Sequence, residues 1–216
     1  MTERPILFSA PMVKAILAGS KTETRRVVTS ANSLVNGSPP CMRKNKDIIE
    51  AWCNLDFSKA WVDKGPSPAG NPGPYLKVPG GDESVHRVYS RVQAGDRLWV
   101  KETFVPRYFD DGKPAYRADW TAWATEVVKQ PKWKPSIFMP RWASRITLEV
   151  TDVRVERLQD ISDEDAGAEG VSCWVCFEVL WQSINGKRPG CSWDDNPLVW
   201  VIAFRRVESA AVEKAS

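Results

Sequence analysis

The chain has 216 residues, of which 43% are hydrophobic and 26% charged, and this balance is typical of a globular domain with one well-buried core rather than of a disordered chain. Its net charge of +3 is too small to indicate a nucleic-acid partner, so the positions of the basic residues matter more than their number. The sequence has neither an apolar run long enough to span a bilayer nor a signal-peptide pattern at its N-terminus, and we therefore expect a cytoplasmic protein with no membrane partner.

An amphipathic helix is predicted over residues 11–18. Pro11 suits a first helical turn, and Gly19 stands where a C-cap belongs. One face of this helix carries the apolar residues Met12, Val13, Ile16 and Leu17. The helix leads directly into the basic segment 20–26, whose sequence is Ser-Lys-Thr-Glu-Thr-Arg-Arg.

The stretch from residue 30 to residue 92 is predicted to be an irregular insertion. Seven of the 16 prolines and six of the 13 glycines lie between residues 29 and 91, and they interrupt the apolar periodicity except at 48–61, which is compatible with a helix. We expect a single domain over residues 1–207 that carries this insertion, followed by a C-terminal tail over residues 208–216.

Three strands are predicted in the remainder of the chain. The first follows a turn at 94–96 and covers residues 97–104. The second covers residues 145–155, and its alternation shifts phase near Asp152, which is typical of a bulge. The third is a continuous apolar run over residues 198–204, which indicates a buried strand.

Two further helices are predicted between the second and third strands. One begins with an acidic first turn after Ser162 and ends at Gly170, and the other covers residues 174–185. Strands at distant points of the chain with helices between them favour a mixed α+β fold, mostly β, built as a small β-barrel with helices packed outside.

Four of these segments together resemble the ASCH domain of the PUA-like superfamily. In chain order they are Gly-Ser-Lys-Thr-Glu-Thr-Arg-Arg at 19–26, Gly-Asp-Arg-Leu-Trp-Val at 95–100, Ala-Gly-Ala-Glu-Gly at 166–170 and the last strand through Phe204. The likeness is strongest to the longer ASCH proteins of bacteriophages and prophages. It implies a PUA-like barrel with a cleft towards which the Lys-Thr-x-Thr-Arg segment points, and for a phage protein it implies the cytoplasm of a bacterial host.

The resemblance also implies candidate activities. Some small bacterial members of the family are amidohydrolases that remove the acyl group from N4-acetylcytidine with a lysine, a threonine and a glutamate, which match Lys21, Thr24 and Glu169 here. Other members bind RNA or cut single strands of it. The small enzymes lack the insertion and the Trp- and Arg-rich segment that this chain adds.

The three matched residues have a chemistry of their own. The hydroxyl of Thr24 is a weak nucleophile that needs a base, and Lys21 can supply one if a dry pocket and the neighbouring Arg25 and Arg26 depress its pKa. Glu169 could hold the lysine, relay a proton or orient water. The alternative is that Lys21 and Thr24 only bind phosphate while Glu169 forms a structural salt bridge.

The segment 131–145 is a second candidate for ligand binding, because it holds four basic residues, three aromatic residues and no acidic ones. Arginine forks suit phosphate, and indole faces suit unstacked bases. The residues expected to bind the substrate here are Trp133, Lys134, Arg141, Trp142 and Arg145. The alternative is a loop that covers the core with Trp142 and Met139 packed inward.

Glu102 ends a strand beside the same cleft. It either accepts an amino group of a base or pairs with Arg26, and the ion pair is the favoured interpretation. The segment 116–119 is a weaker candidate for lining this cleft.

No metal and no cofactor are predicted. Cys173, Cys176 and Cys191 do not supply the four well-spaced ligands of a structural zinc site, and the single histidine, His86, lies in the insertion. The odd number of cysteines favours reduced thiols.

These features together predict a cleft that binds RNA or a modified nucleoside, with no obligatory protein partner. Three activities use the same cleft and stay open: hydrolysis of the amide of N4-acylcytidine, cleavage of single-stranded RNA, and binding without catalysis.

Overall fold

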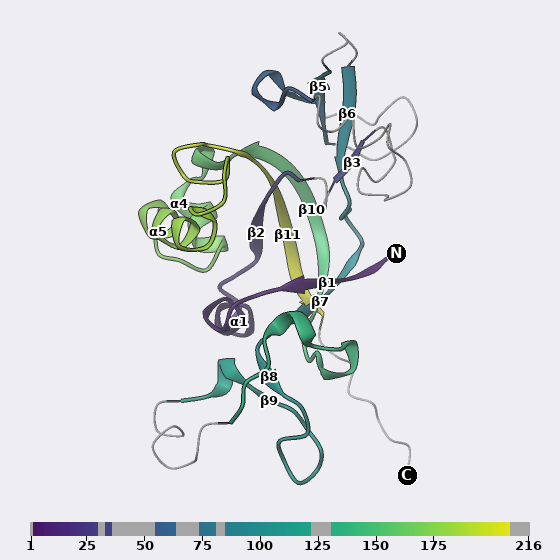
Figure 1. Cartoon of the computed structure of the whole chain (residues 1–216), viewed down its shortest axis with the longest axis vertical. Helices are drawn as coiled ribbons and strands as arrows, with labels where there is room; N and C mark the ends of the chain where they lie inside the picture. Colours follow the sequence, from purple (N-terminus) through teal and green to yellow (C-terminus); the bar gives the residue numbers. More distant parts are fainter. Residues whose placement is uncertain are drawn as a thin grey trace. The chain divides into compact units, whose positions relative to one another are not determined.

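The computed structural model describes residues 2–29, 33–35, 55–63, 74–80, 85–121 and 131–207. Within these ranges the fold is mixed α+β and mostly strand (Figure 1). The chain divides into two compact units, the first made of residues 1–22, 95–150 and 204–216 and the second of residues 23–94 and 151–203. The organisation as one domain over residues 1–207 stays a prediction.

The first unit contains β1 (Glu3–Leu7), which runs parallel to β7 (Arg97–Lys101), and β7 pairs antiparallel with the start of β10 (Thr147–Arg157). Helix α1 (Ala10–Leu17) follows β1 and buries Val13 and Ile16. The first unit also holds five short elements: β8 (Phe104–Val105), β9 (Ala115–Tyr116) and the 3-10 turns η2 (Arg117–Asp119), η3 (Ser136–Phe138) and η4 (Arg141–Ala143).

The second unit contains β2 (Glu23–Val27), which pairs antiparallel with the first part of β11 (Leu198–Val207). After β10 come the turn η5 (Leu158–Asp160) and the helices α4 (Asp163–Ala168) and α5 (Trp174–Asn185), which pack on each other. The apolar core of this unit consists of Leu158, Ile161, Ala166, Phe177, Trp181, Trp193, Val199 and Val201.

The predicted helices and strands of the two units are confirmed at element level. Helix α4 begins with a capping box between Ser162 and Asp165, which satisfies backbone N–H groups at its start. Gly19 and Gly170 follow α1 and α4 with φ angles of 78° and 86°, a backbone conformation that favours glycine. The phase shift in β10 is also present, because Thr151 and Asp152 are exposed in succession.

The expected irregular insertion is wrong for its described residues, which form an antiparallel sheet. The strands β3 (Ser33–Val35), β4 (Trp61–Asp63), β5 (Tyr75–Pro79) and β6 (Val85–Ser90) lie in the order β3-β6-β5-β4. Cross-strand pairs hold this sheet together, as between Tyr75 and Tyr89, whose ring centroids are 5.1 Å apart. Such short strands, separated by proline- and glycine-rich segments, leave too little alternation for a sequence pattern to show.

The helix expected over 48–61 falls largely outside the described residues. Its last part is not α-helical, because residues 57–59 form the 3-10 turn η1 (Phe57–Lys59) and β4 begins at Trp61.

The sheet that contains the longest strands is not closed into a barrel, which departs from the small β-barrel expected from the sequence. Its strand order is β1-β7-β10-β11-β2, and closure would require the two edge strands to pair with each other. Among the described residues β1 pairs with β7 and β2 with β11, and no pairing joins the two edges. No helix in the described part of the chain is long and apolar enough to cross a membrane.

Candidate functional site

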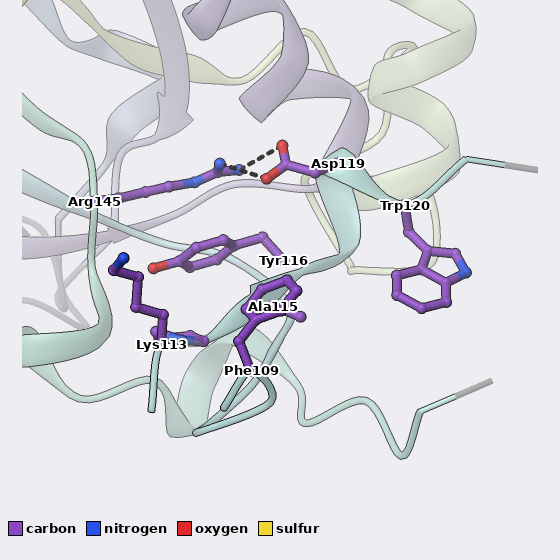
Figure 2. Close-up of a pocket in the computed structure, with 8 residues that line it drawn as sticks. Phe109, Lys113, Ala115, Tyr116, Asp119, Trp120 and Arg145 are labelled. Carbon is purple, nitrogen blue, oxygen red and sulfur yellow. Dashed lines mark hydrogen bonds and ion pairs between the residues drawn. The ribbon is translucent and has the colours of Figure 1, made fainter. Parts of the chain in front are cut away.

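A cavity of about 390 Å³ lies in the first unit, and we call it the aromatic pocket (Figure 2). Its size is within the range of roughly 300–1,000 Å³ that small-molecule sites occupy. The lining residues are Phe109, Lys113, Pro114, Ala115, Tyr116, Asp119, Trp120 and Arg145.

A short hairpin builds one side of the aromatic pocket. Strand β8 pairs with β9, which places Phe104 opposite Tyr116, and the connecting loop closes with backbone hydrogen bonds. The N–H groups of Tyr108 and Phe109 both donate to the carbonyl of Lys113, at 2.9 and 3.2 Å. The loop therefore presents the exposed side chains of Phe109 and Lys113 beside the β9 residues.

Arg145 fixes the opposite side of the pocket through two carboxylates. Its guanidinium donates to both oxygens of Glu102, at 2.9 and 3.1 Å, and to both oxygens of Asp119, at 2.6 and 3.0 Å. The same guanidinium lies 4.0 Å from the ring centroid of Tyr116. Figure 2 shows Arg145 joined to Asp119 with the Tyr116 ring alongside. Bidentate pairing and ring stacking together restrict this side chain to one orientation.

Burial and charge act in opposite directions on these groups. Burial raises the pKa of Glu102 although Arg145 favours its ionised form. Burial also raises the pKa of Tyr116. For Arg145, burial opposes the charge, but hydrogen bonds to Glu102 and Asp119 outweigh it and raise the pKa. Arg145 is therefore a permanent cation that neutralises a buried carboxylate and orients an exposed one.

The floor of the pocket is supported by packed side chains. The Tyr116 hydroxyl donates to the carbonyl of Ala143 at 2.9 Å, and the Tyr116 ring packs on a buried cluster of Phe104, Met139 and Ala143. The turn η2, which carries Asp119, contacts α1. The pocket is thus held by the core of the unit rather than by exposed loop contacts alone.

An edge-to-face series of rings extends from the pocket. The ring centroid of Trp120 lies 5.9 Å from that of Tyr108 and 5.4 Å from that of Trp133, and both rings are nearly perpendicular to the Trp120 ring. The guanidinium of Arg117 lies 5.4 Å from the centroid of Trp133. These contacts fix Trp120 as a pocket wall.

The residues predicted in segment 131–145 are divided between the pocket and another surface. Arg145 lines the pocket, Trp133 packs behind Trp120, and the backbone of Lys134 exchanges hydrogen bonds with Phe104. Arg141 instead pairs with Glu3 at 2.8 Å. The inward packing considered for this segment is correct for Met139, which is buried, and wrong for Trp142, whose side chain is 61% exposed.

Two features of the pocket were not foreseen. The salt bridge of Glu102 is with Arg145, whereas the sequence favoured Arg26. Phe109, Lys113 and Trp120 were not among the predicted residues; the Asp-Asp-Gly turn at 110–112 and the aromatic residues on either side of it are the signal that could have indicated a hairpin tip.

In the second unit, Arg25 is the centre of what we call the arginine cluster. Its buried guanidinium lies 3.2 Å from Asp165, 3.4 Å from Glu156 and 3.5 Å from Glu169. Its backbone N–H donates to Glu169 at 2.6 Å. The remaining members are Glu23 and Arg154, the latter bonded to Glu23, Glu156 and Asp165 at 2.6–2.9 Å.

The arginine cluster connects strand β2, strand β10 and helix α4, and it fixes Glu169 at the end of α4. Burial lowers the pKa of Arg26, and the charge of Glu169 opposes this effect. Thr24, on the same strand, is also buried. Of the predicted residues in this unit, the structure thus brings Arg25 and Glu169 into direct contact.

Lys21 belongs to the first unit and is almost fully buried, with its Nζ atom 5.7 Å from the centroid of Phe8. His86 lies in β6. In the ranges that the structure describes, no three histidine, cysteine or acidic side chains gather as a metal site would require.

Comparison with known proteins gives no relative: no family model, no curated protein and no solved structure matches the chain.

Proposed function

We propose that this protein binds an unpaired base of RNA, or a nucleoside, in the aromatic pocket of the first unit. The observation that carries this proposal is the position of Arg145, which stacks on Tyr116 and fixes the Asp119 carboxylate at a cavity walled by aromatic rings. Aromatic faces with few fixed polar groups are the usual means by which proteins hold a splayed-out base.

Each wall has a role in this interpretation. Phe109 is 53% exposed and offers a face on which a base can stack. Asp119 accepts hydrogen bonds from an exocyclic amino group, which favours cytosine and adenine over uracil. Lys113 is exposed at the rim in an ion pair with Asp111, and it contacts the phosphate or the ribose by exchanging that carboxylate for the ligand.

The test is binding of a labelled single-stranded RNA, followed by fluorescence anisotropy, with Phe109→Ala and a matched control. Phe138→Ala is that control, because Phe138 is 71% exposed in the same unit but does not line the pocket. We expect Phe109→Ala to weaken binding by about 10- to 100-fold, the usual contribution of about 1–3 kcal/mol from one stacked base. Equal affinities of the two variants would contradict the proposed pocket.

The length of the RNA recovered after incubation distinguishes binding from cleavage. Intact strands after incubation support a reader of RNA, whereas shortened strands of defined length would indicate the ribonuclease that the sequence left open. Affinity should fall as salt rises, because phosphate contacts release counterions.

Amide hydrolysis of N4-acylcytidine by Lys21, Thr24 and Glu169 is a second candidate that stays a prediction from the sequence, because Lys21 belongs to the first unit and Thr24 and Glu169 belong to the second. All three side chains are at most 4% exposed, and Glu169 is bound by Arg25 in the arginine cluster. In the predicted reaction the Thr24 hydroxyl would attack the amide carbonyl, Lys21 would accept the hydroxyl proton, and Glu169 would relay a proton to the departing amino group as the C–N bond breaks. Water would then hydrolyse the acyl ester on Thr24, which releases the carboxylic acid and restores the hydroxyl.

Release of cytidine from N4-acetylcytidine, measured by chromatography, tests this candidate. Thr24→Ala should abolish release, while Thr22→Ala, at an exposed position two residues earlier, should leave it unchanged. Cytidine release by the Thr24→Ala variant would remove the proposed nucleophile.

Membership of the ASCH family is likewise a proposal. It is supported by the four sequence segments named above, which contain residues of β2, β7, α4 and β11. The open sheet is a departure from the barrel that the resemblance implies.

A further inference from the structure

Two cysteines stand at the N-terminus of α5, in the second unit. Cys173 is the N-cap residue of this 12-residue helix, and Cys176 lies in its first turn. Their sulfur atoms are 3.5 Å apart. A disulfide has a sulfur–sulfur distance of about 2.05 Å, so a side-chain movement of roughly 1.5 Å separates this pair from a covalent bond.

The surroundings of the two thiols favour a reactive cysteine over an inert one. Cys176 is exposed and Cys173 is partly exposed, whereas Cys191 in the same unit is buried. Hydrogen bonding from the backbone and thiol of Cys176 lowers the pKa of Cys173, as the N-terminus of a helix does for a thiolate. The hydroxyl of Ser172 lies 3.2 Å from the Cys176 sulfur.

Reagents can reach the pair. Trp174, between the two cysteines, is 44% exposed and lines a surface cavity of about 480 Å³ together with Gln159, Ile161 and Trp193. The first turn of the helix is anchored by a hydrogen bond of 3.0 Å from the Trp174 N–H to Asp163 and by stacking of Trp174 on Trp193. The backbone that carries both thiols is thus ordered while the thiols stay accessible.

We propose that Cys173 and Cys176 form a redox-active dithiol that closes reversibly to an intramolecular disulfide by exchange with a low-molecular-weight disulfide such as oxidised glutathione. This chemistry is independent of the proposed ligand site, because the aromatic pocket belongs to the other unit.

The exchange proceeds in two balanced steps. The Cys173 thiolate attacks one sulfur of the small disulfide, which breaks the S–S bond, forms a mixed disulfide and releases one thiol. The Cys176 thiol then loses its proton and attacks the Cys173 sulfur, which forms the internal S–S bond and releases the second thiol. The two electrons removed from the dithiol reduce the small disulfide, and the two protons leave on the released thiols.

The test uses the full chain in which Cys41, Cys53 and Cys191 are replaced by serine, so that only the pair remains. The protein is equilibrated with reduced and oxidised glutathione at varied ratios, quenched with acid and analysed by intact mass. We expect a species lighter by two hydrogens that disappears on reduction. Replacing Cys176 by serine in this chain should instead trap glutathione on Cys173, because the resolving thiol is gone.

A second measurement compares the reactivity of the individual thiols. In the otherwise wild-type chain, iodoacetamide at neutral pH should alkylate Cys173 at least about tenfold faster than the buried Cys191. A pair that stays reduced in excess oxidised glutathione, or that takes up one glutathione on each cysteine, would overturn the proposal.

Discussion

Each unit contains an arginine bound by carboxylates, and the difference between the two arginines distinguishes the proposed ligand site in the first unit from a buried cluster in the second. Arg145 in the first unit and Arg25 in the second each bond to carboxylates and lie over an aromatic ring, Tyr116 at 4.0 Å and Phe177 at 5.8 Å. The side chain of Arg25 is fully buried, whereas that of Arg145 is 26% exposed at a cavity.

The exposure of the carboxylates bound to each arginine determines whether a ligand can reach them. Around Arg145, one carboxylate is buried and the other, Asp119, is half exposed at the aromatic pocket. Around Arg25, every partner is at least three-quarters buried, and the contacts connect two strands with α4. An oriented, accessible carboxylate can bind a ligand, while a buried cluster stabilises the positions of the elements that carry it.

The largest expected effect is on stability, from Arg25→Leu. Removal of the central cation leaves several carboxylates close together, with Glu169 buried, so we expect the free energy of unfolding to fall by about 3–5 kcal/mol. Arg145→Leu should cost less, about 1–3 kcal/mol, because Asp119 regains water and Glu102 can accept a proton. Urea denaturation of both variants measures the difference. A smaller loss for Arg25→Leu than for Arg145→Leu would break the comparison.

The elements around both arginines were predictable because their signals are local. Helix α4 follows from Ser162 and the acidic turn behind it, and β11 follows from seven consecutive apolar residues beginning at Leu198. A capping box and a continuous apolar run depend on neighbours within a few residues, and those neighbours are visible in the sequence.

The partners of each arginine were not predictable in the same way. Arg145 meets Glu102 across 43 positions, and Arg25 meets Glu169 across 144. From the sequence alone, every arginine near the expected cleft is an equally good ion-pair partner for a carboxylate. The sequence analysis therefore favoured Arg26 as the partner of Glu102. The tertiary path of the chain determines which arginine lies beside which carboxylate. For the same reason the sequence did not identify Phe109 and Trp120 as pocket residues.

A smaller effect is expected on selectivity, from Asp119→Asn. The amide can still bond to Arg145 through its oxygen but loses the charge that favours an exocyclic amino group. We expect the preference for cytidine- over uridine-containing RNA to fall by about tenfold, equivalent to about 1.4 kcal/mol, while the fold is retained. Competition binding with two oligonucleotides that differ in one base measures this. An unchanged preference would place recognition outside the pocket.

The smallest expected effect is on the pH dependence of the free energy of unfolding. Asp165 in the arginine cluster and Glu102 at the aromatic pocket should contribute to it with opposite signs. Burial opposes ionisation of Asp165, but hydrogen bonds from Ser162 and the charge of Arg25 outweigh it and lower the pKa of Asp165. Its contribution to stability is present above the pKa of the unfolded chain and is lost as the pH falls through the folded value.

The pKa of Glu102 is raised mainly by burial, so its ionisation costs stability at neutral pH, and this cost disappears as the pH falls below its unfolded value. Urea titrations between neutral pH and about pH 3 should therefore show the wild type losing its advantage over Asp165→Asn on acidification and gaining relative to Glu102→Gln. Parallel profiles for the two variants would mean that the buried and the exposed arrangements do not differ electrostatically. Opposite slopes would locate the acid sensitivity of the fold in the arginine cluster.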